Sequence, residues 1–111
     1  MSVTVKNSNF KKSARKVRQV CDLVRKKKVE EALKILRFNE KKETAIMLSK
    51  LINSGLSIAS ESEKYDLDNL IIEKIFVNEG PTQKRIQPRA QGRAFRINKR
   101  SCHTTVVLKE A

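Results

Sequence analysis

A cationic segment, Gly80 to Arg100, places the strongest constraint on the fold of this chain. Its sequence, GPTQKRIQPRAQGRAFRINKR, holds seven basic residues and no acidic one. The flanking runs LIIEKIFVNE and SCHTTVVL are rich in β-branched residues, which is typical of strands. Because its only sizeable apolar side chains are Ile86, Phe95 and Ile97, the segment has little apolar area with which to offset the entropy of ordering. The pattern predicts a long basic β-hairpin arm, at about residues 80–100, that is ordered by an anionic partner.

The tip of this arm is predicted near Pro88 to Gly92. Pro88 cannot donate to a strand ladder and Gly92 tolerates a positive φ. A strand rises ~3.3 Å per residue, so the roughly twelve residues between Val77 and the tip allow a reach of about 40 Å.

Arginine outnumbers lysine in the arm by five to two, and a guanidinium can bind phosphate oxygens in a bidentate manner and stack on a base. This choice favours nucleic acid over an acidic protein or a membrane.

The net charge is divided unevenly along the chain. The 111 residues include 25 Lys and Arg and 12 Asp and Glu, which leaves a formal net charge of +13. Residues 1–28 contribute +9 and residues 80–100 contribute +7, whereas residues 29–79 contribute −3. Two basic surfaces flanking a slightly acidic middle are typical of a protein that binds a polyanion.

Length and composition favour a single domain, 1–111, in a reducing compartment such as the cytoplasm. Domains usually contain ~100 to 150 residues, and no linker or repeat divides this chain. We find no apolar run of the ~18 residues needed to span a bilayer and no secretory signal pattern. Cys21 and Cys102 are far apart in the sequence and have neither metal-ligand spacing nor a disulfide framework. We therefore expect no membrane, metal or cofactor.

Hydrophobic periodicity predicts an α+β fold, with three helices packed on one face of a small antiparallel sheet from which the arm protrudes. A short strand is expected at Val3–Val5, and Ser13 is the candidate N-cap of the first helix. The DLDN sequence at Asp66–Asn69 predicts a turn before the two long strands. The expected helices are Ala14–Val24, Val29–Leu36 and about Lys42–Ser60.

Composition alone leaves two nucleic-acid functions open. With no Trp and 5% aromatic residues, the chain lacks the stacking surface of a sequence-reading single-strand binder. Binding of folded RNA through phosphate and sugar contacts remains possible on composition, as does an architectural DNA-binding function in which the β-arm reaches around the duplex.

A third interpretation is a nuclease that uses His103, but the sequence contains no second acid, base or metal cluster to support it. His103 is therefore interpreted as a hydrogen-bonding structural residue or an RNA contact.

Three segments of the chain resemble one protein family: SARKVRQVCDLVRKKKVEEALKIL, IFVNEGPTQKRIQPRAQGRAFRINKR and RSCHTTVVL. They are similar to the bacterial-type ribosomal protein twenty-two family of the large subunit, over nearly the whole chain. The most specific piece is GPT followed by KRI, PRA, GRA and RI at fixed spacing. The resemblance implies a structural, non-enzymatic ribosomal protein of the cytoplasm or of an organelle. Its implied partners are large-subunit rRNA, whose assembly it aids, neighbouring ribosomal proteins, and the nascent polypeptide in the exit tunnel that the hairpin tip lines.

The resemblance also implies which side chains contact rRNA. In the arm they are Lys84, Arg85, Arg89, Arg93, Arg96, Lys99 and Arg100. At the first helix they are Ser13, Arg15, Lys16 and Arg18, which would form a second contact. The tip that would face the tunnel comprises Arg89, Ala90, Gln91, Gly92 and Arg93.

The chain departs from the family pattern at several positions. Ala14 stands where the family commonly has Pro, and the tip region departs at Gln83, Gln87, Gln91 and Phe95. These changes make the tip more polar and less charged than is usual in the family. Two roles remain open for Phe95, stacking on a base or packing against Ile97 of the arm itself.

Overall fold

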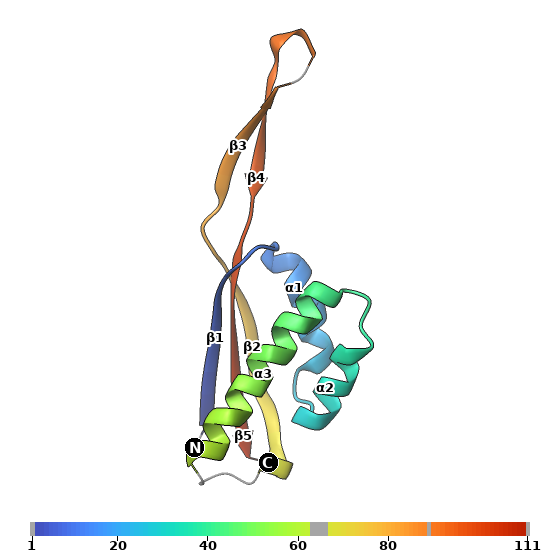
Figure 1. The fold of residues 1–111 in the computed structure, drawn as a ribbon, viewed down its shortest axis with the longest axis vertical. Helices are drawn as coiled ribbons and strands as arrows, with labels where there is room; N and C mark the ends of the chain where they lie inside the picture. The colour runs from blue at the N-terminus through green and yellow to red at the C-terminus, as the bar shows by residue number, and fades with distance from the viewer. Residues whose placement is uncertain (1, 63–66, 89, 111) are drawn as a thin grey trace.

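Three helices cover one face of a three-stranded antiparallel sheet, and a two-stranded arm continues beyond it (Figure 1). The computed structural model describes residues 2–62, 67–88 and 90–110. The sheet has the order β1-β5-β2, so β5 (Cys102–Glu110) is central and β1 (Ser2–Phe10) and β2 (Leu70–Glu79) are its edges. This arrangement confirms the α+β fold predicted from the sequence.

Each helix begins at the residue that the apolar periodicity predicted. They are α1 (Ala14–Val24), α2 (Val29–Arg37) and α3 (Lys42–Ser62), and the last two extend one and two residues beyond the predicted ends. α1 packs along β2 and α3 packs along β1, while α2 contacts both other helices (Figure 1). The start of α1 consequently lies beside the root of the arm.

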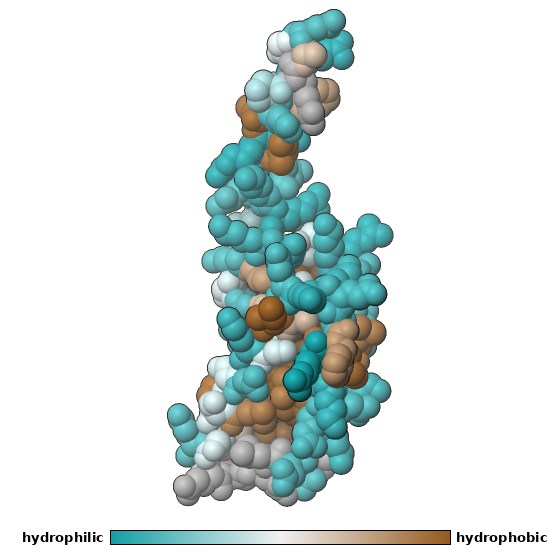
Figure 2. All heavy atoms as spheres, turned by 45° about the vertical axis from the view of Figure 1, so that its right-hand side comes forward, coloured by the Kyte–Doolittle hydropathy of each residue, from teal (hydrophilic) through white to brown (hydrophobic). Residues whose placement is uncertain are grey.

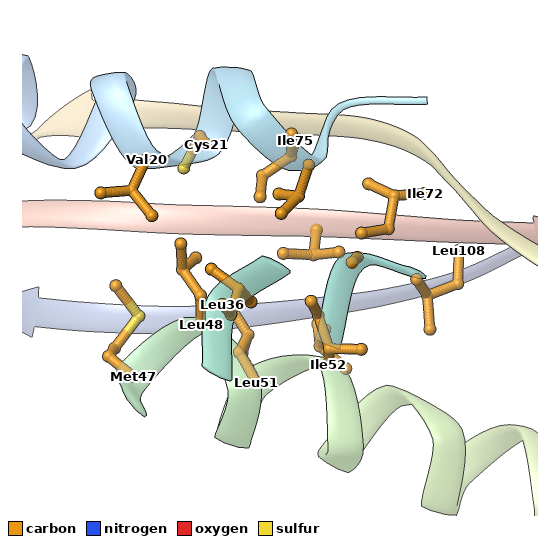
Figure 3. Packing of buried hydrophobic residues seen from close by; sticks show 14 of the residues in the cluster. Val20, Cys21, Leu36, Met47, Leu48, Leu51, Ile52, Ile72, Ile75 and Leu108 are labelled. Atoms are coloured by element: carbon orange, nitrogen blue, oxygen red, sulfur yellow. The ribbon is translucent and has the colours of Figure 1, made fainter. Parts of the chain in front are cut away.

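The hydrophobic core fills the space between the helices and the sheet (Figure 3). Leu48 and Ile52 of α3 and Leu108 of the central strand point into this space, and all three side chains are fully buried. Burying such a side chain contributes about 1.5–3 kcal/mol. Gly55 allows α3 to approach the sheet, because a Cβ at this position would lie 2.8 Å from Leu108 Cδ1. The core therefore fixes the distance of the helices from the sheet.

β1 is longer than the predicted strand at Val3–Val5, since it runs from Ser2 to Phe10. The prediction ended too early because Lys6 to Asn9 carry no apolar alternation. An edge strand needs only backbone pairing to continue, and β1 pairs with β5 from Ser2 to Asn7 and again at Phe10. The register shifts between Asn7 and Phe10, where Asn9 adopts a φ of 59°, so a β-bulge turns the chain toward α1.

The outer edge of β2 is closed by α1 and the turn that follows it. Arg18 donates from Nε and Nη2 to the carbonyl of Val77, at 3.2 and 2.8 Å. Arg25, two helical turns later, donates from Nη2 to the carbonyl of Ile75 at 3.1 Å. Backbone bonds of 3.0 Å join Ile72 to residues 26 and 27. These contacts supply hydrogen-bond partners for backbone N–H and C=O groups of β2 that an open edge strand would leave unpaired.

The arm is formed by β3 (Gln83–Pro88) and β4 (Ala94–Lys99), which pair antiparallel from Gln83 opposite Lys99 to Pro88 opposite Ala94. All of β3 is exposed, and only Ile97 of β4 is partly covered. The arm extends away from the body and gives the molecule a longest dimension of 63 Å (Figure 1). It therefore adds length and charge but no part of the core.

Two predicted turns have different outcomes. The arm turns through Ala90–Gly92, with φ values of 65° at Gln91 and 75° at Gly92, so the predicted tip is correct for its described residues. The DLDN turn begins at Asp66, which lies outside the described residues, and its remaining part, Leu67–Asn69, is a 3-10 turn.

Candidate nucleic-acid interface

A basic cleft of about 930 Å³ lies between the start of α1 and the root of the arm. It is open to solvent, and hydrophilic side chains predominate where the arm joins the body (Figure 2). Its lining contains seven cationic side chains and no carboxylate. The cations are Lys11, Lys12, Arg15, Lys16, Arg85, Lys99 and Arg100. Because a concave cationic surface concentrates the local field, this cleft is a candidate anion-binding site, in which Lys12 also pairs with Glu43 at 3.0 Å.

The start of α1 has the charge arrangement that an isolated helix disfavours. Its first turn contains Arg15 and Lys16 and no acidic residue, and the side chain of Ser13, the N-cap residue, makes no capping hydrogen bond. The amino end of a helix carries a partial positive charge and unpaired N–H groups, so cations there raise the free energy of the folded protein. An anion such as a phosphate would offset this cost.

α2 shows the opposite arrangement and serves as an internal comparison. Glu30 and Glu31 occupy its first turn, whereas Lys34 and Arg37 occupy its last. Both ends match the helix dipole, which stabilises a free helix by about 0.3–1 kcal/mol per charge. The chain thus follows the ordinary charge rule at both ends of α2 and breaks it at the start of α1, beside the cleft.

Hydrogen bonds at the root of the arm hold its cations beside α1. Ser101 Oγ donates to the carbonyl of Pro81 at 2.7 Å, and the N–H of Gly80 donates to the carbonyl of Ser101 at 2.9 Å. The two chains cross closely here, because a Cβ on Gly80 would lie 2.7 Å from Ser101 Oγ. These contacts position Lys99 and Arg100 at the cleft.

Register separates the cations along the arm. Lys84 lies opposite Asn98, Arg85 opposite Ile97, Arg96 opposite Ile86, and Lys99 opposite Gln83. No two cations of the paired strands therefore face each other directly, which avoids the destabilisation caused by opposed like charges. Because side chains alternate along a strand, Arg85 and Lys99 lie on one face of the arm and Lys84 and Arg96 on the other. The arm is consequently cationic on both faces.

The structure brings part of the predicted site together and separates the rest. Ser13, Arg15 and Lys16 line the cleft with Arg85, Lys99 and Arg100, so the two contacts expected from the sequence form one surface. Lys84 and Arg96 lie on β3 and β4, and Arg93 directly precedes β4. Ala90, Gln91 and Gly92 form the tip, whereas Arg89 lies outside the described residues.

Arg18 has a different position from its neighbours on α1. Its guanidinium is bound to the Val77 carbonyl and does not line the cleft. The sequence pattern alone gives no signal that separates it from Arg15. Lys11 and Lys12 line the cleft, although they were absent from the predicted contact residues. The sequence could have indicated these two lysines as contact residues, because they directly precede the N-cap Ser13 in the basic first segment.

His103 has a structural contact. Its Nδ1 accepts a hydrogen bond from the N–H of Asn9 at 3.1 Å. Asn9 is the bulged residue of β1, so the imidazole satisfies a backbone donor at the point where that strand is irregular. Among residues 2–62, 67–88 and 90–110, no group of three or more His, Cys, Asp or Glu side chains has an arrangement that could hold a metal ion.

The two cysteines lie on the core side of the molecule. Both thiols are free and both residues are fully buried. Burial raises the pKa of Cys21 from 9.0 to about 12; the charge of Arg25 lowers this pKa slightly and that of Asp22 raises it. Burial also raises the pKa of Cys102. Such protonated, inaccessible thiols are poor nucleophiles.

The body, the two-faced cationic arm and the cleft at its root define an α+β protein with an extended polyanion-binding surface. The comparison with known families specifies the class further. The family model for ribosomal protein L22p/L17e matches residues 5–109, and the chain belongs to this family. It is therefore a ribosomal protein of the large subunit that binds rRNA, and its family is structural rather than catalytic. No helix in the described part of the chain is long and apolar enough to cross a membrane.

Proposed function

We propose that the arm penetrates folded large-subunit rRNA and that its tip forms part of the wall of the polypeptide exit tunnel. The observation that supports this proposal is the distribution of cations over both faces of an arm that contributes nothing to the core. A strand pair lying on a flat RNA surface would need cations on one face only. Cations on both faces suit an arm surrounded by phosphates.

The cleft would hold the rRNA backbone where the arm leaves the body. Arg85, Lys99 and Arg100 approach a phosphate from the arm, while Ser13, Arg15 and Lys16 approach from the amino end of α1. Guanidinium groups supply bidentate hydrogen bonds and the helix end supplies N–H donors, so the site recognises phosphate without reading bases. Contacts from two elements at once would fix the direction of the arm.

Binding at the cleft and along the arm would also organise rRNA during subunit assembly. One molecule would neutralise phosphates that are brought together by rRNA folding, because its two basic surfaces meet at the cleft. We further propose that the subunit belongs to a bacterial-type ribosome of the cytoplasm, with neighbouring ribosomal proteins around the body. The nascent polypeptide would pass the turn formed by Ala90, Gln91 and Gly92.

A cysteine-directed cross-linker tests the tunnel placement. The native Cys21 and Cys102 are both 0% exposed, so a single added cysteine becomes the reactive site. Ala90→Cys places it at the exposed tip, and Glu30→Cys places it on the exposed, acidic start of α2 as a matched control. We expect large subunits carrying Ala90→Cys to cross-link a stalled nascent chain, and those carrying Glu30→Cys to give none. Equal or absent cross-linking, with both variants incorporated into subunits, would exclude the tunnel placement.

A further inference from the structure

The three-stranded sheet has a second face, opposite the helices, that no described helix covers. The buried residues of each strand, apart from Thr105, point to the helix side, so the alternate residues form this open face. The register aligns them in rows across the sheet: Thr4, Val107 and Lys74 form one row, Lys6, Thr105 and Phe76 the next, and His103 and Asn78 lie beyond them.

Phe76 is the aromatic residue of this face. It lies on the edge strand β2 and its relative exposure is 43%. Thr105, between Phe76 and Lys6 in the same row, is only 5% exposed. An aromatic ring therefore lies at the surface of an edge strand, with a lysine at the other end of its row.

The charge of the open face favours an anionic partner. Lys6, Lys74 and Lys109 all belong to it, and the nearby carboxylate of Glu73 lies 3.9 Å from the ammonium of Lys109. Three lysines beside one carboxylate give this face a net positive charge. Thr4 and Asn78 add hydrogen-bonding side chains beside the ring. An exposed aromatic ring among lysines and small polar side chains suits a nucleotide, because the ring can stack on a base while ammonium groups neutralise phosphates.

We propose that the open face of the sheet binds an unpaired nucleotide of rRNA, with its base stacked on Phe76 and its flanking phosphates neutralised by Lys6 and Lys74. This inference rests on rRNA binding, as proposed above, and adds a second surface with different chemistry. The cleft recognises backbone phosphate alone, whereas the open face requires a base that is free to leave its helix. The two surfaces therefore respond to different RNA forms.

Binding of short RNAs to the full chain tests the proposal. The probes are a fluorescently labelled single-stranded oligoadenylate of 12 nucleotides and an RNA duplex of 12 base pairs, measured by anisotropy at fixed salt. Phe76→Leu keeps apolar bulk and removes the ring, and Phe38→Leu is the matched control because Phe38 is 82% exposed at the end of α2. We expect Phe76→Leu to weaken binding of the single strand by about fivefold or more and to leave duplex binding unchanged. Phe38→Leu should change neither.

A second measurement does not depend on the stability of a variant. The ring signals of Phe76 in the NMR spectrum of the wild-type protein should shift when the single strand is added and remain in place when the duplex is added. Equal affinities for Phe76→Leu and Phe38→Leu, or a Phe76 ring that does not respond to the single strand, would overturn the proposal. A loss of single-strand and duplex binding together would overturn it too, since stacking is specific to unpaired bases.

The cleft is tested separately in the same assay. Arg85→Gln combined with Lys99→Gln removes two of its cations and should weaken duplex binding. If this double variant binds the duplex as the wild type does, the phosphate-binding role of the cleft fails. The result for Phe76 is then still interpretable, because that residue lies on β2 and does not line the cleft.

Discussion

Lys16→Glu should raise the stability of the free protein and weaken its binding to RNA. Lys16 is exposed in the first turn of α1, three residues after the N-cap Ser13. The substitution removes a cation from the positive end of the helix dipole and places an anion there. It also creates a Ser-x-x-Glu pattern, in which Ser13 and the new carboxylate can cap each other's backbone N–H groups. Stability and binding should therefore change in opposite directions.

The size of each effect follows from the position. A charge at a helix end contributes about 0.3–1 kcal/mol, so reversing its sign and adding the cap should stabilise the protein by about 1 kcal/mol. For a chain of this size, that corresponds to a rise of roughly 4 °C in Tm. The loss of one phosphate contact should make the slope of log affinity against log salt less steep by about 1.

Lys34→Glu provides the control. It makes the same change in net charge, but in the last turn of α2 and away from the cleft. An acid there opposes the dipole, so we expect a stability loss of about 0.5 kcal/mol and a nearly unchanged salt slope. Thermal unfolding gives the stabilities, and rRNA-fragment binding at several salt concentrations gives the slopes. A lower Tm for Lys16→Glu, or equal changes of slope in the two variants, would refute the argument.

Three further predictions follow from the structure. Deleting 83–95 should leave a body that unfolds cooperatively in calorimetry, because none of the arm's described residues is buried; a broad, non-cooperative transition would contradict this. Arg18→Ala should lower the free energy of unfolding in urea by about 1–2 kcal/mol, through loss of the hydrogen bonds to Val77, whereas Arg15→Ala should change it by less than about 0.5 kcal/mol; equal losses would argue against closure of the β2 edge. Burial of the protonated Cys21 thiol should contribute stability that is complete below pH 9 and is lost as the pH rises toward about 12, and iodoacetamide should label this thiol only after unfolding; rapid labelling of the native protein at pH 8 would contradict its burial.

Apolar spacing was sufficient to predict the helices. The stripe through Val17, Cys21 and Val24 is buried as expected, and α1 begins directly after Ser13. The same reasoning could not find the full length of β1, because Lys6 and Asn7 are held by backbone pairing to β5 and Asn9 by a hydrogen bond to His103, which leave no hydrophobic pattern. For this reason hydrophobic periodicity does not detect the full length of such an edge strand.

The cleft was harder to predict, because it joins residues from the two ends of the chain. Lys16 and Lys99 meet through the bulge in β1 and the crossing at Gly80, and neither contact has a local signature. Arg18 and Arg15 also look equivalent in sequence, since the carbonyl that binds Arg18 belongs to a distant strand. Charge clustering predicted which segments are basic, and only packing decides which of their side chains remain available to an anion.

Mapping of rRNA contacts in assembled subunits would test the central claim most directly. Large subunits containing this protein would be irradiated with ultraviolet light, and the cross-linked peptides identified by mass spectrometry. The cleft and the two-faced arm predict cross-links within residues 11–16 and 83–100, and few within α2, where Glu30 and Glu31 lie. Cross-links confined to α2 and α3, with none at the cleft or the arm, would contradict the account.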